Sequence, residues 1–291
     1  MKFTKVIYEK DRANKAIARI TLNCPDKLNV WQFKGGMTDE FYAALEQAEE
    51  DDDIKVVIIK GAGRAFSAGH DLTEVGFVYG MGTGQPGERR PSQRIRLKLD
   101  RLWMWKNLPR VLYCSKVTIA QVHGYCIGEG LVVSNLCDIT IAAEDAHLAH
   151  AEQRLGFSGS GLPLAQLYLS VGMKRARELL LTGRAVSGVE AERIGLVNKV
   201  VPADKLEEET NKMAEAITLL PADGIAIGKA MTHLLLDRLG LTTSFILGYV
   251  GHTLFTNLRW EPDEYNFFKE RKEKGPKAGF HGRDDRFAGK V

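Results

Sequence analysis

Two glycine-rich segments constrain the fold more than any other feature of this chain, because each follows an apolar strand and leads into a helix. The first covers residues 61–72 after the apolar run at 56–59, and the second covers residues 123–130 after the run at 118–122. The first N–H groups of a helix have no intrahelical acceptor, so such a turn offers donors to an anion. Two converging turns would form an oxyanion hole, which stabilises negative charge developing on a carbonyl oxygen.

Strands and helices alternate through the first half of the chain. Residues 3–22 alternate as a β-hairpin, and capping residues at 38–40 open a helix that leads to a strand at 55–60. The second glycine-rich segment runs into a helix at 128–136 and then a strand at 139–143. This order predicts an α/β fold with right-handed crossovers and a parallel sheet.

Helical patterns dominate the second half of the chain. Glycine and proline residues interrupt any regular hydrophobic pattern across residues 74–92, which predicts a loop. A helix is predicted after it, through residues 95–105. Further helices end in a short strand at 195–201, so we divide the chain into a core at 1–200 and a helical region at 201–291. The elements expected in the helical region are helices at 206–219, 221–239, 242–258 and 262–274, then a polar segment at 275–291 that covers a surface of this chain or of a neighbour.

Composition argues against several classes of protein. With 291 residues, of which 44% are apolar and 26% charged, the chain has an ordinary globular composition, and its net charge of +3 is far below that of a dedicated nucleic-acid binder. The amino terminus lacks a hydrophobic signal core, and no apolar run approaches membrane-spanning length. The four cysteines form no CxxC pair, which is typical of reduced thiols. We therefore expect a cytoplasmic protein with no nucleic-acid or membrane partner.

Five segments stand in a characteristic order. They are Asn-Cys-Pro-Asp-Lys-Leu-Asn-Val at 23–30, Phe-Ser-Ala-Gly-His-Asp-Leu at 66–72, Ala-Gln-Val-His-Gly-Tyr-Cys-Ile-Gly-Glu-Gly at 120–130, Leu-Leu-Leu-Thr-Gly-Arg at 179–184 and Glu-Ala-Glu-Arg-Ile-Gly-Leu-Val-Asn at 190–198. In this order and spacing they resemble the crotonase (enoyl-CoA hydratase/isomerase) superfamily. The resemblance implies an α/β spiral of repeated strand-strand-helix turns with a C-terminal helical trimerisation region, assembled as a homotrimer or a dimer of trimers.

The resemblance also implies an acyl-CoA thioester as substrate, with coenzyme A part of that substrate and no separate cofactor. Carried over position by position, the backbone N–H groups of His70 and Glu129 hold the thioester oxygen as an enolate forms. In the family, a C-terminal segment matched here by Phe268 contacts the CoA of a neighbouring subunit. The substrate-binding residues implied in this way are Lys27, Leu28, Ala68, Gly69, His70, Asp71, Leu72, Tyr125, Gly128, Glu129 and Phe268.

The acid/base positions depart from the family pattern. The first carboxylate of the hydratases falls on Val132 and the second on Glu152, so the resemblance implies Glu152 as the acid/base. Hydratases of the superfamily that act on aromatic acyl-CoAs also lack the first acid. The family's glycine at the second oxyanion position is Glu129 here, which would replace the missing acid if its carboxyl group entered the pocket, or would otherwise face solvent or a basic neighbour. A carboxylate beside an enolate is costly unless it is protonated. The candidate catalytic residues are Glu152, Glu129 and His70.

Several reactions fit these residues. Hydration of a 2-enoyl-CoA is the first prediction, and the glycine-rich loop with Trp103 and Trp105 suggests a bulky or cyclic acyl group. Isomerisation of an enoyl-CoA, hydrolysis of an acyl-CoA or a C–C bond, and non-catalytic acyl-CoA binding are the alternatives, because all of them use the same oxyanion hole. His147 and His150 have no third ligand nearby, so we expect no metal site. No serine stands in a GxSxG turn, which argues against a serine hydrolase.

Overall fold

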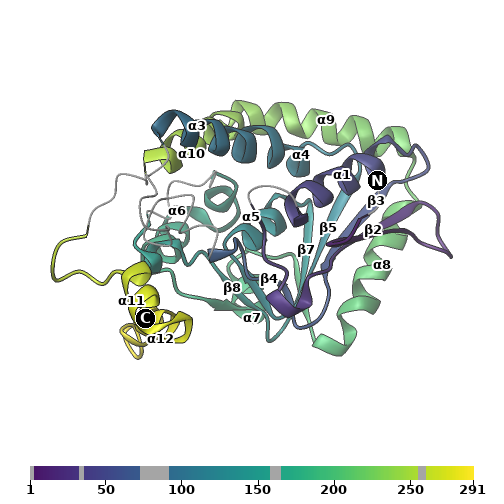
Figure 1. Ribbon diagram of the computed structural model, residues 1–291. Helices are drawn as coiled ribbons and strands as arrows, with labels where there is room; N and C mark the ends of the chain where they lie inside the picture. Colours follow the sequence, from purple (N-terminus) through teal and green to yellow (C-terminus); the bar gives the residue numbers. More distant parts are fainter. Residues whose placement is uncertain (1–2, 33–35, 73–91, 158–164, 255–259) are drawn as a thin grey trace.

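The strands form two sheets that lie between layers of helices (Figure 1). The computed structural model describes residues 3–32, 36–72, 92–157, 165–254 and 260–291. All described strands precede residue 202, and the described part of the chain beyond it is helical. The division into regions at residue 200 stays a prediction.

The larger sheet contains, in spatial order, β1 (Val6–Lys10), β2 (Ile17–Leu22), β3 (Val56–Gly61), β5 (Val117–Val122), β7 (Ile139–Ala143) and β10 (Lys199–Val201). β1 and β2 pair antiparallel, as the predicted hairpin requires. The pairs from β2 through β10 are parallel. The first four residues of β3 and the last five of β5 are buried, as expected for parallel strands covered on both faces.

The smaller sheet contains, in spatial order, β4 (Ala65–Ser67), β6 (Tyr125–Ile127), β8 (His147–Ala149) and β9 (Val186–Ser187). The first three strands pair parallel, and β9 pairs antiparallel with β8. Each of these three follows a strand of the larger sheet, since β3 leads into β4, β5 into β6 and β7 into β8. This repetition confirms the predicted spiral of strand-strand-helix turns.

Glycines at the corners between the two sheets let successive turns of the spiral approach each other. A Cβ atom at Gly61 would overlap the carbonyl oxygens of Ala65 and Phe66, and one at Gly124 would overlap that of Arg64. Gly124 also has a φ of +54°, which L side chains rarely adopt. The contact at Gly124 brings the two glycine-rich segments together, and the one at Gly61 tightens the first of them.

Helices cover both faces of the larger sheet. Those that contact its central strands or the β1–β2 hairpin are α1 (Gly36–Glu50), α5 (Glu129–Leu136) and α8 (Leu206–Thr218), while a short helix at residues 188–193 contacts β10. Figure 1 shows α8 on one side of the sheet and α1 and α5 on the other. Apolar residues of α1 recur at helical spacing and are buried, which explains why this segment folds as an amphipathic helix.

A further group of helices packs beyond α5, partly along the upper edge of Figure 1. It contains α3 (Gln93–Arg101), the π-helical segment η2 (Leu102–Asn107), α4 (Pro109–Leu112), α6 (Ala165–Thr182), α9 (Ala222–Arg238) and α10 (Leu241–Leu254). α10 contacts α3, η2, α6 and α9. Gly172, with a φ of +76°, bends α6 between two helical portions. α10 therefore links the helix that follows the predicted loop to the C-terminal region.

The last two helices fold back onto the spiral, as the yellow segments of Figure 1 show. They are α11 (Phe267–Lys274) and α12 (Pro276–Asp285), and α12 contacts η3 (Glu152–Leu155). The helix predicted at 262–274 begins at Phe267, and the segment predicted as polar surface contains α12. The predicted loop at 74–92 lies outside the described residues except for residue 92. The remaining short helices are η1 (Pro25–Lys27), α7 (Gly188–Arg193) and η5 (Ala203–Lys205).

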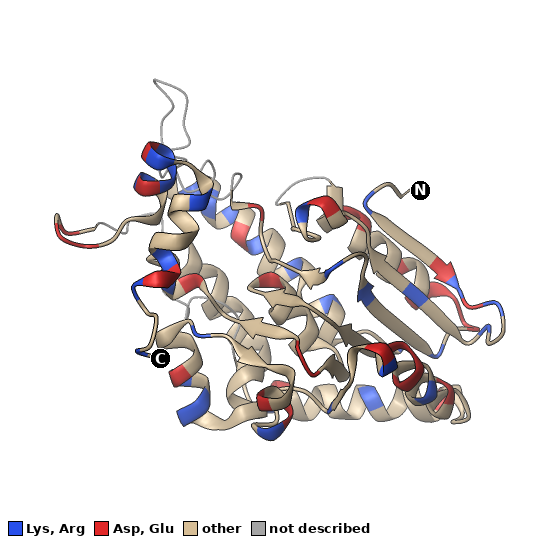
Figure 2. Ribbon diagram, turned by 90° about the horizontal axis from the view of Figure 1, so that it is seen from below, with Lys and Arg blue, Asp and Glu red and all other residues tan. Residues whose placement is uncertain are grey.

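Charged residues of both signs are interspersed along the chain. In the view of Figure 2, basic and acidic positions alternate without a large region of one sign. Among the described helices, no single one is both long and apolar enough to cross a membrane, and one bent pair, 203–218 with 222–238, passes that test of length and composition when taken together.

Candidate active site

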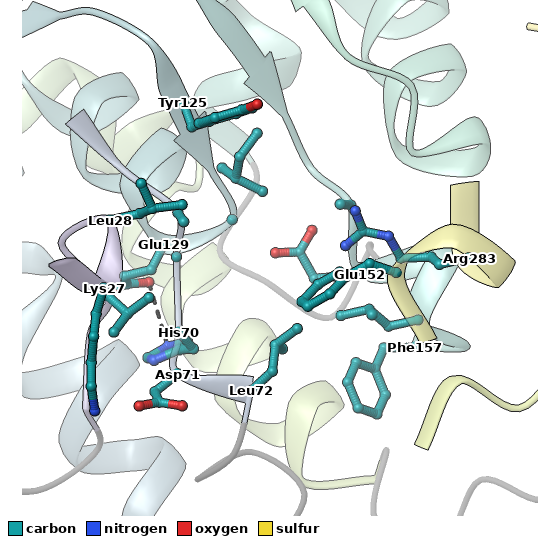
Figure 3. Close-up of a pocket in the computed structure, with 18 of the residues that line it drawn as sticks. Lys27, Leu28, His70, Asp71, Leu72, Tyr125, Glu129, Glu152, Phe157 and Arg283 are labelled. Carbon is teal, nitrogen blue, oxygen red and sulfur yellow. Dashed lines mark ion pairs between the residues drawn. The ribbon is translucent and has the colours of Figure 1, made fainter. Parts of the chain in front are cut away.

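A cavity of about 660 Å³ opens where the two glycine-rich turns meet η3 and the C-terminal helices. Its wall includes ten of the eleven residues predicted to bind substrate, together with Glu152. Figure 3 shows several of these side chains around one hollow. The predicted residues that line it are Lys27, Leu28, Ala68, Gly69, His70, Asp71, Leu72, Tyr125, Gly128 and Glu129.

The loop at residues 23–30 is held against the first turn by one buried amide. The Asn29 side chain donates hydrogen bonds to the carbonyl oxygens of Ala62 (2.9 Å) and Ala65 (2.8 Å), and it accepts one from the Cys24 N–H (2.8 Å). Because these bonds satisfy a fully buried polar group, they fix the loop firmly. Lys27 and Leu28 lie directly before it and face the cavity.

The first glycine-rich turn has an extended backbone that forms a β-bridge with Trp31. The Trp31 N–H donates to the Gly69 carbonyl oxygen, and the Asp71 N–H donates to the Trp31 carbonyl oxygen, both over 2.9 Å. In such a bridge alternate residues point to opposite sides, so the His70 N–H faces away from Trp31. A Cβ atom at Gly69 would lie 3.5 Å from the Glu129 nitrogen, which shows how closely the two turns approach.

The second turn starts α5 at the residue after Gly128. The first bond of this helix runs from the Val132 N–H to the Gly128 carbonyl oxygen (2.9 Å). The N–H of Glu129 therefore has no acceptor within the helix, as expected at a helix start. Gly128 has a φ of +54°, which favours glycine. The backbone thus places a helix N-terminus at the wall of the cavity.

Glu152 begins η3 and points into the cavity from the side opposite to Lys27 and Leu28 (Figure 3). A Cβ atom at Gly128 would lie 2.9 Å from Glu152 Oε1, so this glycine leaves room for the carboxyl group. Glu152 Oε2 lies 3.9 Å from His150 Nδ1, and no described residue hydrogen-bonds to it. Burial raises the pKa of Glu152 to about 7, and the nearby Arg283 opposes that shift. Its side chain keeps 21% exposure, although Oε2 itself is buried.

The side chain of Glu129 is buried at the wall of the cavity and does not face solvent. It is only 1% exposed, and the Trp103 indole N–H donates to Glu129 Oε1 over 2.6 Å. Glu129 Oε2 lies 3.9 Å from His70 Nε2, the pair joined by the dashed line in Figure 3. Burial raises the pKa of Glu129 to about 8 and lowers that of His70 to about 3. Near pH 7 both groups are neutral, so this contact is not an ion pair.

Other predicted positions lie outside the cavity wall. Val132 is buried in the main core, so no carboxyl group comes from that position of α5. Phe268 is buried behind the cavity, where its ring packs against that of Phe157 at a centroid distance of 5.5 Å. The C-terminal helices nevertheless reach this chain's own cavity through Arg271, Phe280 and Arg283. The family resemblance suggested instead that this segment serves a neighbouring subunit.

Sequence reasoning missed the polar residues that the helices add to the wall. Trp103 from η2 and His252 from α10 line the cavity beside Glu129, whereas the sequence pointed to Trp103 only as a sign of a bulky or cyclic acyl group. His252 lies 156 positions from Arg96, its hydrogen-bonded neighbour, so no local pattern could have revealed it. The described residues contain no group of three His, Cys, Asp or Glu side chains able to hold a metal ion.

The comparisons with known proteins agree with this geometry. Residues 12–243 match the family described as "Enoyl-CoA hydratase/isomerase". A putative enoyl-CoA hydratase of Mycobacterium tuberculosis, EchA13, is 34% identical over 242 residues, covering 78% of this chain and 73% of that protein. A probable mitochondrial enoyl-CoA hydratase of Dictyostelium discoideum is 33% identical over 213 residues, which covers 73% of this chain and 70% of the relative.

Solved structures give the same result. The crystal structure of an enoyl-CoA hydratase/isomerase from Xanthobacter autotrophicus Py2 has a TM-score of 0.79 with 29% sequence identity, and the match covers 98% of this chain and 99% of that one. An enoyl-CoA hydratase from Mycobacterium smegmatis has a TM-score of 0.82 with 25% identity, covering 99% and 95%. The fold, the paired glycine-rich turns and these likenesses establish that the chain belongs to the enoyl-CoA hydratase/isomerase family of enzymes.

Proposed function

We propose that the protein adds water to a 2-enoyl-CoA, in which the carbon–carbon double bond of the acyl group is conjugated to the thioester carbonyl. The observation that carries the proposal is the meeting of the two glycine-rich turns beside a carboxyl group. The His70 N–H and the Glu129 N–H hold the thioester oxygen at the wall of the cavity. Donors fixed before the reaction stabilise the enolate more than the neutral thioester, which lowers the barrier to attack at the β carbon.

Glu152 activates the water in this scheme. Its carboxylate lies over Gly128, next to the proposed oxyanion site, and its partial exposure gives water a path to it. As the water oxygen bonds to the β carbon, Glu152 takes the water proton and the π electrons move onto the thioester oxygen. A base whose pKa lies near 7 suits this transfer at neutral pH, because it is ionised yet still basic.

The cations at the rim of the cavity support CoA as the carrier of the acyl group. Lys27 and Arg64 line the cavity, and their charges suit the phosphates of CoA. The cavity is within the volume range of small-molecule sites, and its apolar residues suit an acyl chain. A bulky or cyclic acyl group remains our expectation. We further propose that the protein works in the cytoplasm and needs no cofactor beyond the CoA of its substrate.

We also propose that the protein assembles as a homotrimer, or as a dimer of trimers, through its helical region. Within α9, all of which the structure describes, Ile225 is the one buried residue. A surface of this kind is typical of a face covered by another subunit. The exposed apolar side chains of α9 and α10 are Ile227, Met231, Leu234, Leu235, Ile246, Leu247, Val250 and Leu254. Analytical ultracentrifugation should give a trimer or hexamer mass, and Met231→Asp with Leu234→Asp should give monomers.

A panel of enoyl-CoAs with straight, branched, cyclic and aromatic acyl groups tests the activity. Loss of the absorbance of the conjugated thioester, with a 3-hydroxyacyl-CoA as product, is expected for at least one of them. Glu152→Gln should lower kcat by about 10²–10⁴-fold, the usual contribution of a positioned acid or base. A shifted double bond with no added water would show an isomerase, and release of free CoA would show a hydrolase. Tight binding of acyl-CoA with no product at all would overturn the enzymatic proposal.

A further inference from the structure

We propose that the Glu129 side chain is the second proton-transferring group of the reaction and delivers the proton to the α carbon. The inference rests on the proposed hydration. It assigns two functions to one residue, since the Glu129 backbone N–H holds the oxyanion while its carboxyl group serves the adjacent carbon. In this way the oxyanion turn supplies the acid that α5 lacks at Val132.

The position of the carboxyl group supports this assignment. The Trp103 indole N–H holds Oε1 at 2.6 Å, which leaves Oε2 as the oxygen able to carry a transferable proton. Oε2 is a buried atom with no hydrogen-bond partner among the described residues, and Glu129 is one of the residues that line the cavity. The carboxyl group is only two methylene groups removed from its own backbone, so it stays near the oxygen that the backbone N–H holds. The α carbon is two bonds from that oxygen.

The surroundings favour the neutral acid over the carboxylate. Arg96 and Asp100 form a fully buried pair at 2.6 Å, and His252 Nδ1 lies 3.1 Å from the same Asp100 oxygen. The charges of this pair cancel, and burial lowers the pKa of His252, so the cluster offers no net positive charge to an ionised Glu129. The titratable groups that act on Glu129 directly are Tyr42 of α1, His70 of the first turn and Glu152 of η3, and the groups that in turn surround His70 are Arg96, Asp100 and His252.

Trp103 is a positioning residue in this arrangement. Its ring makes edge-to-face contacts with the rings of His70 (4.5 Å) and His252 (5.1 Å), so its orientation is fixed on two sides. A fixed indole restricts Glu129 to one rotamer before substrate arrives. Such preorganisation is what a proton donor to carbon requires.

The protons taken up and released balance over one catalytic cycle. Glu152 accepts a proton from water as the oxygen bonds to the β carbon, and neutral Glu129 gives its Oε2 proton to the α carbon of the enolate. The product leaves with one added water, while Glu152 is protonated and Glu129 is ionised. Transfer of one proton from Glu152 to Glu129 through solvent restores the resting enzyme.

Glu129→Gln tests the inference, because glutamine keeps an acceptor for Trp103 and a similar volume but cannot transfer a proton. On an enoyl-CoA that the wild type hydrates, kcat should fall by about 10²–10⁴-fold with KM little changed. Solvent-deuterium exchange at the α carbon of the matching saturated acyl-CoA isolates the proton step. Exchange should be lost in Glu129→Gln and retained in Glu152→Gln. A Glu129→Gln enzyme with unchanged kcat and exchange would overturn the inference and leave the proposed function intact.

Trp103→Phe provides a second test that does not depend on how Glu129→Gln folds. The indole hydrogen bond favours the ionised carboxyl group, so its removal should raise the pKa of Glu129. The alkaline limb of the kcat profile, expected near pH 8, should therefore move upward. A purely structural role for Trp103 would change kcat without moving this limb, and that result would contradict the inference. A wild type that hydrates no enoyl-CoA would instead reject the proposed function.

Discussion

Glu129 and Glu152 face one cavity, yet their surroundings differ in almost every respect. Glu129 is sealed beneath Trp103 and His70 with 1% of its side chain exposed. Glu152 stands at the start of a short helix with 21% exposed, and Arg283 is close enough to lower its pKa. The closed position favours a neutral acid, whereas the open position can meet water and a cation.

This difference suggests how one fold assigns two protonation states to the same residue type. Burial raises the pKa of Glu129 to about 8 and that of Glu152 to about 7. A base must be ionised and an acid protonated, so the productive pair dominates between these two values. We therefore expect kcat to rise with pH through about 7 and to fall through about 8.

The largest expected effect comes from Gly128→Ala, which alters both carboxyl groups at once. A Cβ atom there would meet Glu152 Oε1 at 2.9 Å, and the φ of +54° would strain the start of α5. We expect kcat to fall by about 10²–10³-fold, similar to the loss of one oxyanion donor. Gly172→Ala is the matched control, because its φ is +76° but nothing lies within 4 Å of the added atom. Equal losses in the two variants would refute a specific role for Gly128.

A medium effect should appear in thermal stability. Folded Glu129 keeps its proton up to about pH 8, whereas the unfolded chain releases it near 4.5, so this group lowers the stability of the wild type as pH rises between those values. Glu129→Gln removes the titration. Its melting temperature relative to wild type should therefore climb by several degrees across this range and then level off.

Glu152→Gln is the comparison for the stability measurement. The same argument predicts a smaller rise in its melting temperature relative to wild type, and this rise should end near pH 7. The reason is that Glu152 has a lower pKa in the folded protein than Glu129 and is more exposed. Calorimetry of both variants from pH 5 to 9 checks the pair. Parallel curves for the two substitutions would show that the two surroundings do not differ as described.

The smallest effect should follow Arg283→Gln. Removal of this charge takes away an influence that lowers the pKa of Glu152, so the acidic limb of kcat should move upward by less than about one pH unit. The alkaline limb should stay in place, because Arg283 is not among the groups around Glu129. A shift of the alkaline limb alone would reverse the assignment of the two carboxyl groups.

Much of the fold could be predicted because its signals are local. The glycine turns, the buried parallel strands and the Ser187 cap of α7 are each encoded within a few residues. The strands of the smaller sheet are two or three residues long, which is too short to reveal the alternating hydrophobic pattern of a strand. α12 was missed because its glycines weaken helix propensity. One of them, Gly279, lets the helix pack closely on Arg271, a contact that only the tertiary structure contains.

The site, like the fold, could be predicted from the sequence only where its signals are local. The backbone positions of His70 and Glu129 followed from motifs, and the structure brings both turns to one cavity. The orientation of the Glu129 side chain did not follow, because it depends on Trp103, which lies 26 positions away on another helix. Arg283 and Phe280 reach the cavity only because the C-terminal helices fold back over η3. Contacts between distant elements are what the sequence pattern could not supply.

The central claim is that the surroundings of the two carboxyl groups hold their pKa values apart and above the ordinary range. Carbon-13 NMR of protein labelled at the glutamate carboxyl carbons measures this directly, without any substrate. We expect one resonance that titrates near pH 7 and is absent in Glu152→Gln, and another that titrates near pH 8 and is absent in Glu129→Gln. If both variants lose only resonances that titrate below pH 5, the account of the site is wrong.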